Sequence, residues 1–350
     1  ITAAALVVAA CGQAGSDDAG EPTSTTPVPP PTSTTAPATT TPTTGAATTT
    51  TAPAPVEPAD ADLGALAPFV EEWNTNWALR TIDLDELDVG IPVPNPRDRI
   101  PPIDEPRFEG IAAADWLADR EPGLLLEFAG IARFYPISIL TWHEIVNDEI
   151  GGVPIAVTYC PLCNTGVVFD RRIGGETHRF GVSGLLRNSD LVMWDDRTES
   201  LWQQITGEAI VGALAGTSLV MIPASIVSFG DFAATFPDGD VLSRETGFGI
   251  AYGANPYTFY SSSPRPFLFD GELDDRYPAL ERVVGVTVGN EGIAFPFSVI
   301  ADLGAVNVAV GGNPIAVLWG APDTADALDA GQIARSRAIG TGVAYSRATS

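Results

Sequence analysis

From residue 122 onward, the chain consists of short apolar runs that are separated by glycine and proline turns. In the segment 153–159 every second residue is large and apolar or aromatic, which is typical of a buried strand. Residues 166–172 and 177–184 flank Gly174-Gly175 and predict a hairpin. The sequence therefore predicts a β-rich α+β fold with many short strands and short helices.

An internal similarity suggests that this pattern occurs twice. Three short stretches recur later in the chain: 130–136 in 292–296, Pro154–Val157 in Pro314–Val317, and 166–169 more loosely in 342–345. We expect two related halves, residues 58–284 and 285–350, with the second copy cut short at its end. Trp319-Gly320 takes the place of Tyr159-Cys160, so only the first half is expected to carry cysteine chemistry.

The segments before residue 122 are less regular. Residues 64–77 predict a short amphipathic helix, and residues 110–119 have a composition that suits another. Residues 91–107, rich in proline and arginine, predict extended chain.

Residues 1–11 predict a signal-peptide remnant with a lipid attachment site. The first ten residues are apolar and uncharged, but a bilayer crossing takes about 20 such residues. They end in Val8-Ala9-Ala10-Cys11, which resembles the lipobox of bacterial lipoproteins. We expect export and a lipid on Cys11 that holds the chain at the outer face of the cell membrane. An ordinary signal peptide with an incidental cysteine is the alternative.

Residues 12–57 are dominated by threonine, proline and alanine. Such a segment buries too little apolar surface to offset the entropy of ordering, so we expect a disordered linker. Its prolines favour an extended spacer between the anchor and the folded part.

The charge balance excludes one class of partner. The chain has 44 acidic residues against 18 basic ones, a formal net charge of −26, and every basic side chain is arginine. Nucleic-acid binding needs basic side chains to neutralise phosphates, so we expect no nucleic-acid partner. The membrane is expected as a partner only through the anchor.

The strongest local signal is Cys160-Pro161-Leu162-Cys163, directly after the predicted strand 153–159. Two thiols at this spacing suit a metal knuckle, and the motif resembles the knuckles of rubredoxins and zinc ribbons. They also suit a redox-active dithiol, or a structural disulfide outside the cytoplasm. A closed zinc site needs four ligands, and a thioredoxin-like pair opens a helix, so each interpretation has a weakness.

Both histidines of the chain lie near this motif in sequence. His143 precedes Cys160 and His178 follows Cys163, so together they make a plausible nitrogen and sulfur site for copper or zinc. Carboxylates near the motif are candidates to orient these ligands: Glu144, Asp148 and Asp195. Asp195 also opens a polar turn before Trp202, which predicts a capped turn above a buried tryptophan. The surroundings of Ser183 predict that it is a turn residue rather than a nucleophile.

Four motifs occur in a characteristic order: His143–Asp148, Tyr159–Cys163, Ser183–Leu186 and Thr198–Trp202. Over about residues 120–350, this order resembles the bacterial and archaeal family known as domain of unknown function 3179. The resemblance implies an extracytoplasmic protein and no particular activity. Three hypotheses follow: a lipoprotein that binds copper or zinc, a thiol–disulfide oxidoreductase, and a non-catalytic surface protein with a structural disulfide.

Overall fold

The computed structural model describes residues 61–289 and 291–347. Cys11, the predicted signal remnant and the linker 12–57 lie outside the described residues, so their assignments stay predictions. Among the residues that the structure describes, no helix has both the length and the apolar character that a membrane crossing requires.

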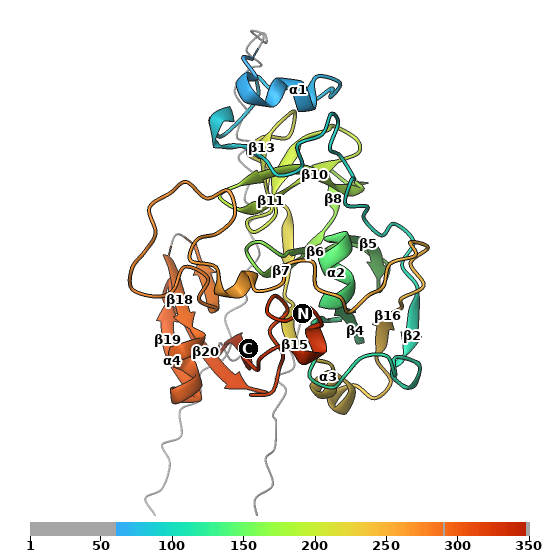
Figure 1. The fold of residues 1–350 in the computed structure, drawn as a ribbon, viewed down its shortest axis with the longest axis vertical. Coiled ribbons are helices and arrows are strands. Elements are labelled where there is room, and N and C mark those ends of the chain that lie inside the picture. The colour runs from blue at the N-terminus through green and yellow to red at the C-terminus, as the bar shows by residue number, and fades with distance from the viewer. Residues whose placement is uncertain (1–60, 290, 348–350) are drawn as a thin grey trace, which may run out of the picture. The chain divides into compact units, whose positions relative to one another are not determined.

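The fold is β-rich, as the sequence predicts, and its helices are short (Figure 1). One antiparallel sheet has the order β1 (Asp88–Val89), β10 (Phe180–Arg187), β11 (Asp190–Asp195), β12 (Leu201–Gln203) and β13 (Glu208–Val211). A second has the order β14 (Val220–Ile222), β7 (Thr165–Asp170), β6 (Val153–Cys160) and β5 (Ile145–Ile150). A third has the order β15 (Ser225–Ser228), β3 (Pro122–Phe128), β4 (Ile131–Pro136), β16 (Asp240–Leu242) and β2 (Phe108–Gly110).

Smaller pieces complete the fold. The remaining strands form the hairpin β8 (Arg172–Ile173) with β9 (Glu176–Thr177), the pair β17 (Val283–Val288) with β18 (Glu291–Pro296), and the sheet β19 (Ala305–Val310), β20 (Asn313–Gly320) and β21 (Thr341–Ser346). The α-helices are α1 (Ala67–Val70), α2 (Ile137–His143), α3 (Phe229–Thr235) and α4 (Phe297–Leu303). The 3-10 helices are η1 (Gly64–Leu66), η2 (Leu84–Glu86), η3 (Ile111–Ala113), η4 (Tyr260–Ser262) and η5 (Ile333–Arg335). The β8–β9 hairpin lies where the two glycines predict it.

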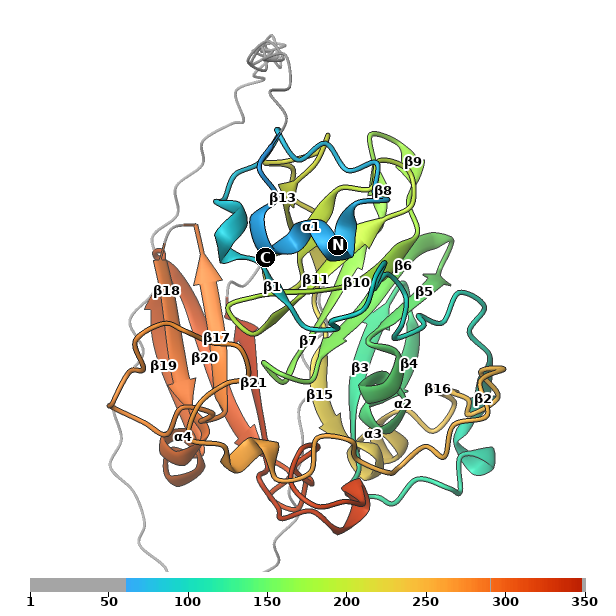
Figure 2. The ribbon, with the colours of Figure 1, turned by 45° about the horizontal axis from the view of Figure 1, so that its top comes forward.

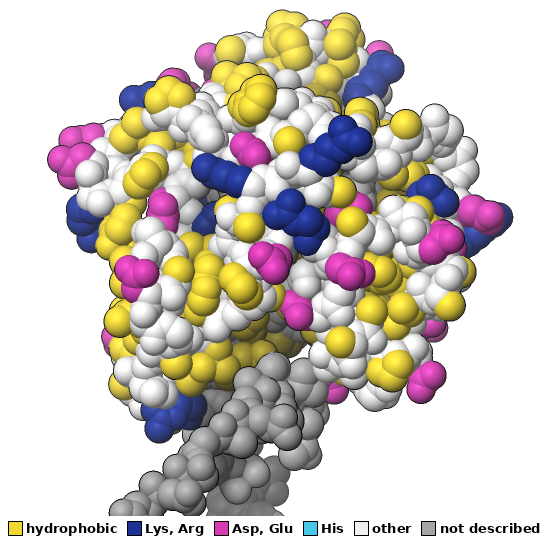
Figure 3. All heavy atoms as spheres, turned by 60° about the horizontal axis from the view of Figure 1, so that its bottom comes forward, with side chains coloured by type: hydrophobic (Ala, Val, Ile, Leu, Met, Phe, Trp, Pro, Cys, Tyr) yellow, Lys and Arg dark blue, Asp and Glu magenta, His cyan; other side chains and the backbone are white. Residues whose placement is uncertain are grey.

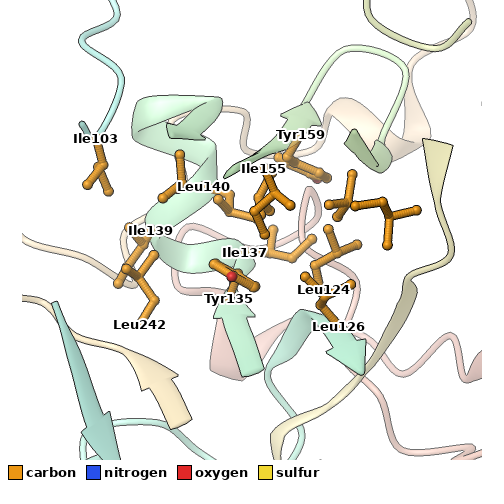
Figure 4. Packing of buried hydrophobic residues seen from close by; sticks show 14 of the residues in the cluster. Ile103, Leu124, Leu126, Tyr135, Ile137, Ile139, Leu140, Ile155, Tyr159 and Leu242 are labelled. Carbon is orange, nitrogen blue, oxygen red and sulfur yellow. The ribbon is translucent and has the colours of Figure 1, made fainter. Parts of the chain in front are cut away.

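Strand β6 is buried on both faces, and its period-two pattern sends alternate side chains into two different cores. Ile155, Val157 and Tyr159 pack into a cluster with residues of β3, β4 and α2, part of which Figure 4 shows. Ala156 and Cys160 point to the opposite face, into a cluster with residues of β10 and β11. The alternation therefore places the first cysteine against the sheet that carries Asp190.

Two segments share one order of elements: β3–β4–α2–β5–β6–β7 and β17–β18–α4–β19–β20–β21. Their strand registers agree at an offset of 160 residues, since Gly123 pairs with Pro136 and Val283 pairs with Pro296. They differ before the last strand: residues 161–164 join β6 to β7, whereas residues 321–340 join β20 to β21. In Figure 2 the second segment lies beside β7 and β15. A common origin of the two segments stays a prediction.

Candidate metal centre

Cys160 and Cys163 lie on either side of a tight turn at the end of a buried strand. Cys160 ends β6 and is buried, whereas Cys163 lies in the turn before β7 and is partly exposed; both are free thiols. The backbone N–H of Cys163 donates to Cys160 Sγ at 3.4 Å, so the turn folds back over the first sulfur. Asn164, with a φ of 50°, leads the chain out of this turn.

A third potential ligand, Asp190, comes from the neighbouring sheet. Asn188 and Ser189, both with positive φ, form the tight turn between β10 and β11, and Asp190 follows as the first residue of β11. The Cys163 thiol donates to Asp190 Oδ1 at 3.2 Å, and Cys160 Sγ donates to the Ser189 carbonyl at 3.8 Å. The ligand atoms of Cys160, Cys163 and Asp190 all lie within 4.8 Å of one another.

Burial dominates the electrostatics of this cluster. It raises the pKa of the Cys160 thiol well above its usual value, and the hydrogen bond and charge of Cys163 act in the same direction. Burial also raises the pKa of Asp190, although the hydrogen bonds from the Ile205 N–H and the Cys163 thiol oppose it. Within the described ranges, no arginine pairs with any of the three groups. A bound cation takes the place of protons at such a site.

The cluster is accessible from the side of Cys163. This residue borders a cavity of about 780 Å³, together with Asn164 and Ser189 from the two turns. Arg282, just before β17, and Thr341, the first residue of β21, line it as well. Cys160 is not among the lining residues, so an ion or small molecule reaches the site past Cys163.

His143 lies at the end of α2, and both of its ring nitrogens have partners. Nδ1 lies 2.6 Å from the Pro101 carbonyl oxygen, and Nε2 lies 2.6 Å from the Tyr252 hydroxyl. Because a carbonyl only accepts, Nδ1 carries the proton and Nε2 accepts from Tyr252. Burial lowers the pKa of His143, while the Pro101 carbonyl opposes that shift. The structure therefore does not bring His143 to the cysteines, and the predicted ligand set is revised accordingly.

His178 is not near the cysteine pair either; its Nδ1 bonds Asp195 Oδ1 at 2.9 Å. Asp195 is fully buried and accepts further hydrogen bonds from groups of its own turn and from Trp202 Nε1. The donors from the turn are Arg197 N, Thr198 N, Thr198 Oγ1 and Ser200 N. Asp195 thus orients His178 and caps the turn above buried Trp202, which leaves its oxygens no free lone pair for a metal ion.

The other two carboxylates do not orient His143. Asp148 accepts hydrogen bonds from Arg133 Nη1 and from the Tyr135 hydroxyl, both at 2.7 Å. The carboxyl of Glu144 has no hydrogen-bond partner among the described residues, and burial together with the charge of Asp190 raises its pKa to about 8. Both residues therefore have surroundings that differ from the predicted ones.

Asp190 is the site residue that the prediction missed. Its signal was the dipeptide Asn188-Ser189 between two apolar runs, which predicts a two-residue hairpin turn. That turn fixes where Asp190 begins its strand, but its approach to Cys163 depends on how two sheets pack. Ser183, predicted as a turn residue, lies inside β10 at its irregularity; its hydroxyl donates to the Val192 carbonyl and accepts from Leu185 N–H.

The comparisons with known proteins identify a family and no activity. No curated protein and no solved structure matches the chain. The family model that matches spans residues 97–350, most of the chain, and confirms the resemblance that the four motifs carry. The chain belongs to the family described as protein of unknown function (DUF3179).

Proposed function

We propose that this chain is an exported, lipid-anchored protein that binds a soft metal ion, zinc in preference to copper, through Cys160, Cys163 and Asp190. One observation carries the metal part: three ligand atoms of zinc-binding residue types converge within 4.8 Å of one another in a buried turn. The free thiols leave both sulfurs available as ligands.

The spacing and the donor types favour zinc. Zinc–ligand bonds of about 2.0–2.3 Å set tetrahedral ligand atoms about 3.5 Å apart. Cys163 Sγ and Asp190 Oδ1 are 3.2 Å apart, so only a small movement makes room for an ion. Copper(I) selects thiolates and thioethers, and the carboxylate is too hard a ligand for it. A fourth position on the side of Cys163 is left for water or a small molecule.

The alternative of a thiol–disulfide oxidoreductase has less support. A reactive dithiol needs a thiol pKa that is lowered by a helix N-terminus or a nearby cation. Cys160 ends a strand, and burial raises its pKa instead. The structural-disulfide alternative requires a bond between the two sulfurs, which are separate thiols here.

The localisation part of the proposal rests on the sequence around Cys11. Replacing Cys11 with serine removes the thiol that accepts the lipid, so Cys11→Ser is expected to move the protein from the membrane fraction to the soluble fraction. Retention of this variant in the membrane fraction contradicts the anchor. It leaves the metal proposal untouched.

The metal part is tested on the full chain, purified under reducing conditions and analysed for bound elements. We expect about one zinc ion per chain, and two thiols that zinc protects from a thiol reagent. Asp190→Asn should weaken zinc binding by more than about tenfold, because the loss of a mere outer-sphere partner already costs 10–100-fold. Zinc affinity is measured by competition with a chromogenic chelator.

Two controls sharpen this test. Asp196→Asn alters the other group of potential ligands, His178 with Asp195 and Asp196, and should leave zinc affinity unchanged. Cys11→Ser removes the third thiol of the chain from the count. The proposal fails if the purified chain holds no metal and Cys160→Ser leaves zinc affinity as it was.

A further inference from the structure

A second cavity, of about 350 Å³, lies on the other side of the cysteine turn. Leu162, between the two cysteines, lines both cavities, but Cys160, Cys163 and Asp190 do not line the second one. The wall of the second cavity is almost entirely apolar and includes Ile91, Ile100, Val182, Leu185, Leu191 and Phe267. Gly184, at the irregularity of β10, also lines the cavity, and its missing side chain lets Pro96 pack against the strand.

Two polar side chains in this wall have no partner. Glu144 is only 6% exposed, and no described residue donates a hydrogen bond to its carboxyl or accepts one from it. The Tyr257 hydroxyl likewise makes no hydrogen bond with the described part of the chain. Both residues line the same cavity, and burial together with the charge of Glu144 raises the pKa of Tyr257. Tyr260, in the same wall, is satisfied, since its hydroxyl donates to Leu162 O and accepts from Phe267 N.

Buried polar groups in folded proteins almost always have partners, and each exception calls for an explanation. Glu144 is buried and Tyr257 is half-buried, and both line one apolar cavity, where an atom of a ligand can serve as the partner that the protein does not supply. An apolar pocket with a few convergent polar groups is the usual form of a small-molecule site. We propose that this cavity binds a small apolar molecule whose single uncharged hydroxyl or carbonyl head group bonds Glu144 and Tyr257.

Size and charge define the class of ligand. At about 30 Å³ per small group, the cavity takes about ten non-hydrogen atoms. No arginine lines it, so an anionic head group has no counterion there. An ammonium head group would bury an ion pair among apolar side chains, which costs more than an uncharged hydrogen bond. The raised pKa of Glu144, about 8, agrees with a carboxyl that stays protonated and donates to an oxygen.

The backbone at Glu144 adds support. Its φ is 58°, a conformation that favours glycine, and Gly304 occupies the same place after α4 with a φ of 69°. The first segment thus holds a carboxyl at a position where the second has none. Strained conformations of this kind cluster at ligand sites.

The test uses three probes of one length, 1-octanol, octylamine and octanoate, titrated into the full chain by calorimetry. We expect saturable 1-octanol binding with one site per chain, and binding of octanoate and octylamine that is at least about tenfold weaker. Tyr257→Phe removes one oxygen atom and should weaken 1-octanol binding about fivefold. The matched control Tyr277→Phe, on an exposed tyrosine, should leave it unchanged.

Other outcomes overturn the proposal. Tighter binding of octylamine than of 1-octanol would show that the head group is a cation. Equal affinity of Tyr257→Phe and wild type, or of Glu144→Leu and wild type, would show that the polar pair does not recognise the ligand. Absence of saturable binding by all three probes would rule out the site, and zinc binding measured on the same sample would be unaffected.

Discussion

Glu144 shows how far a single side chain can depart from its usual surroundings. Its carboxyl is buried without a partner, and its backbone has a positive φ. A conformation of this kind costs on the order of 1–3 kcal/mol, and burial of the charged form adds to that cost. Gly304 shows that the same turn forms without a side chain. The backbone cost therefore comes from having a side chain at this position, and the burial cost comes from the carboxyl group.

The first prediction concerns the ionisation of this carboxyl in the metal-free protein. Its pKa rises from 4.5 to about 8 on folding, so the folded state holds a proton that the unfolded state releases. Stability is then fully present below pH 4.5 and falls as the pH rises through 8. In Glu144→Gln this fall should be absent, which makes the variant on the order of 3 kcal/mol more stable than wild type at pH 8. Urea unfolding at pH 5 and pH 8 measures the difference. If the free energy of unfolding changes equally with pH in the variant and in wild type, the raised pKa of Glu144 is contradicted.

For single residues, the sequence predicts which side chains carry reactive groups better than it predicts which residues they contact in the fold. The cysteine pair is predicted correctly because the four consecutive residues 160–163 of one turn define it. Asp190 and Tyr252 were missed because their contacts cross between sheets or come from a distant loop. Sequence proximity to Cys160 was the only support for His143 as a ligand, but His143 lies at the end of α2, where its ring bonds Pro101 instead.

Among the elements, α2 is joined by hydrogen bonds to two irregular segments of the chain. His143 at its end joins a chain of hydrogen bonds that runs from Thr246 through the Tyr252 hydroxyl to the His143 ring and on to Pro101. The Phe248 ring lies 5.0 Å from the histidine ring, centroid to centroid. The neutral histidine therefore fastens two irregular segments, one on each side of it in sequence, to the end of α2.

The second prediction follows from this neutral ring. Burial lowers the pKa of His143 from 6.5, so below pH 6.5 the unfolded state binds a proton that the folded state refuses. The contribution to stability is present above pH 6.5 and is lost as the pH falls through the lower folded pKa. His143→Gln should remove this loss, which is at most about 1.4 kcal/mol at pH 5.5, when unfolding is compared at pH 7.5 and pH 5.5. The free energy of unfolding changes with pH in the opposite direction for Glu144, so the two single variants distinguish the contributions of the two groups.

The elements that the sequence predicts well are those with local causes. The buried strand β6 and the β8–β9 hairpin follow from alternation and from paired glycines. The helix predicted over residues 110–119 is wrong except for the short η3. Gly110 ends β2 and pairs with β16, and after η3 the Trp116 ring donates to Glu109. The predicted helix over residues 64–77 ends at Val70, and the following loop is held by distant Glu199.

Across the described residues, charged side chains of both signs are spread over the surface, and the two similar segments contribute to one core. On the face in Figure 3, arginines and acidic side chains are interleaved and form no continuous basic area. The segment 321–340 takes the place that the cysteine turn occupies in the first segment, and its Ala327 and Leu328 pack into the core around β6. The second segment is therefore tied to the first by burial as well as by the chain. The sequence similarity did not foretell this, because the joining segment has no counterpart in the first copy.

The last prediction tests that tie. Asp326 is 1% exposed, and its carboxylate lies 3.7 Å from Arg282 Nη2, just before β17, and 3.1 Å from Arg337 Nη2. Removing Asp326 leaves the largely buried Arg282 with an uncompensated charge, whereas Arg337 is 53% exposed and stays solvated, so Asp326→Ala should cost about 1–3 kcal/mol in urea unfolding. Asp274→Ala breaks an exposed pair with Arg276 and should have no measurable effect. If both variants unfold at the wild-type urea concentration, Asp326 does not hold the 321–340 segment in place. If Asp326→Ala alone is weakened, and hydrogen exchange at β6 rises with it, the loss has spread to the core that the two parts share.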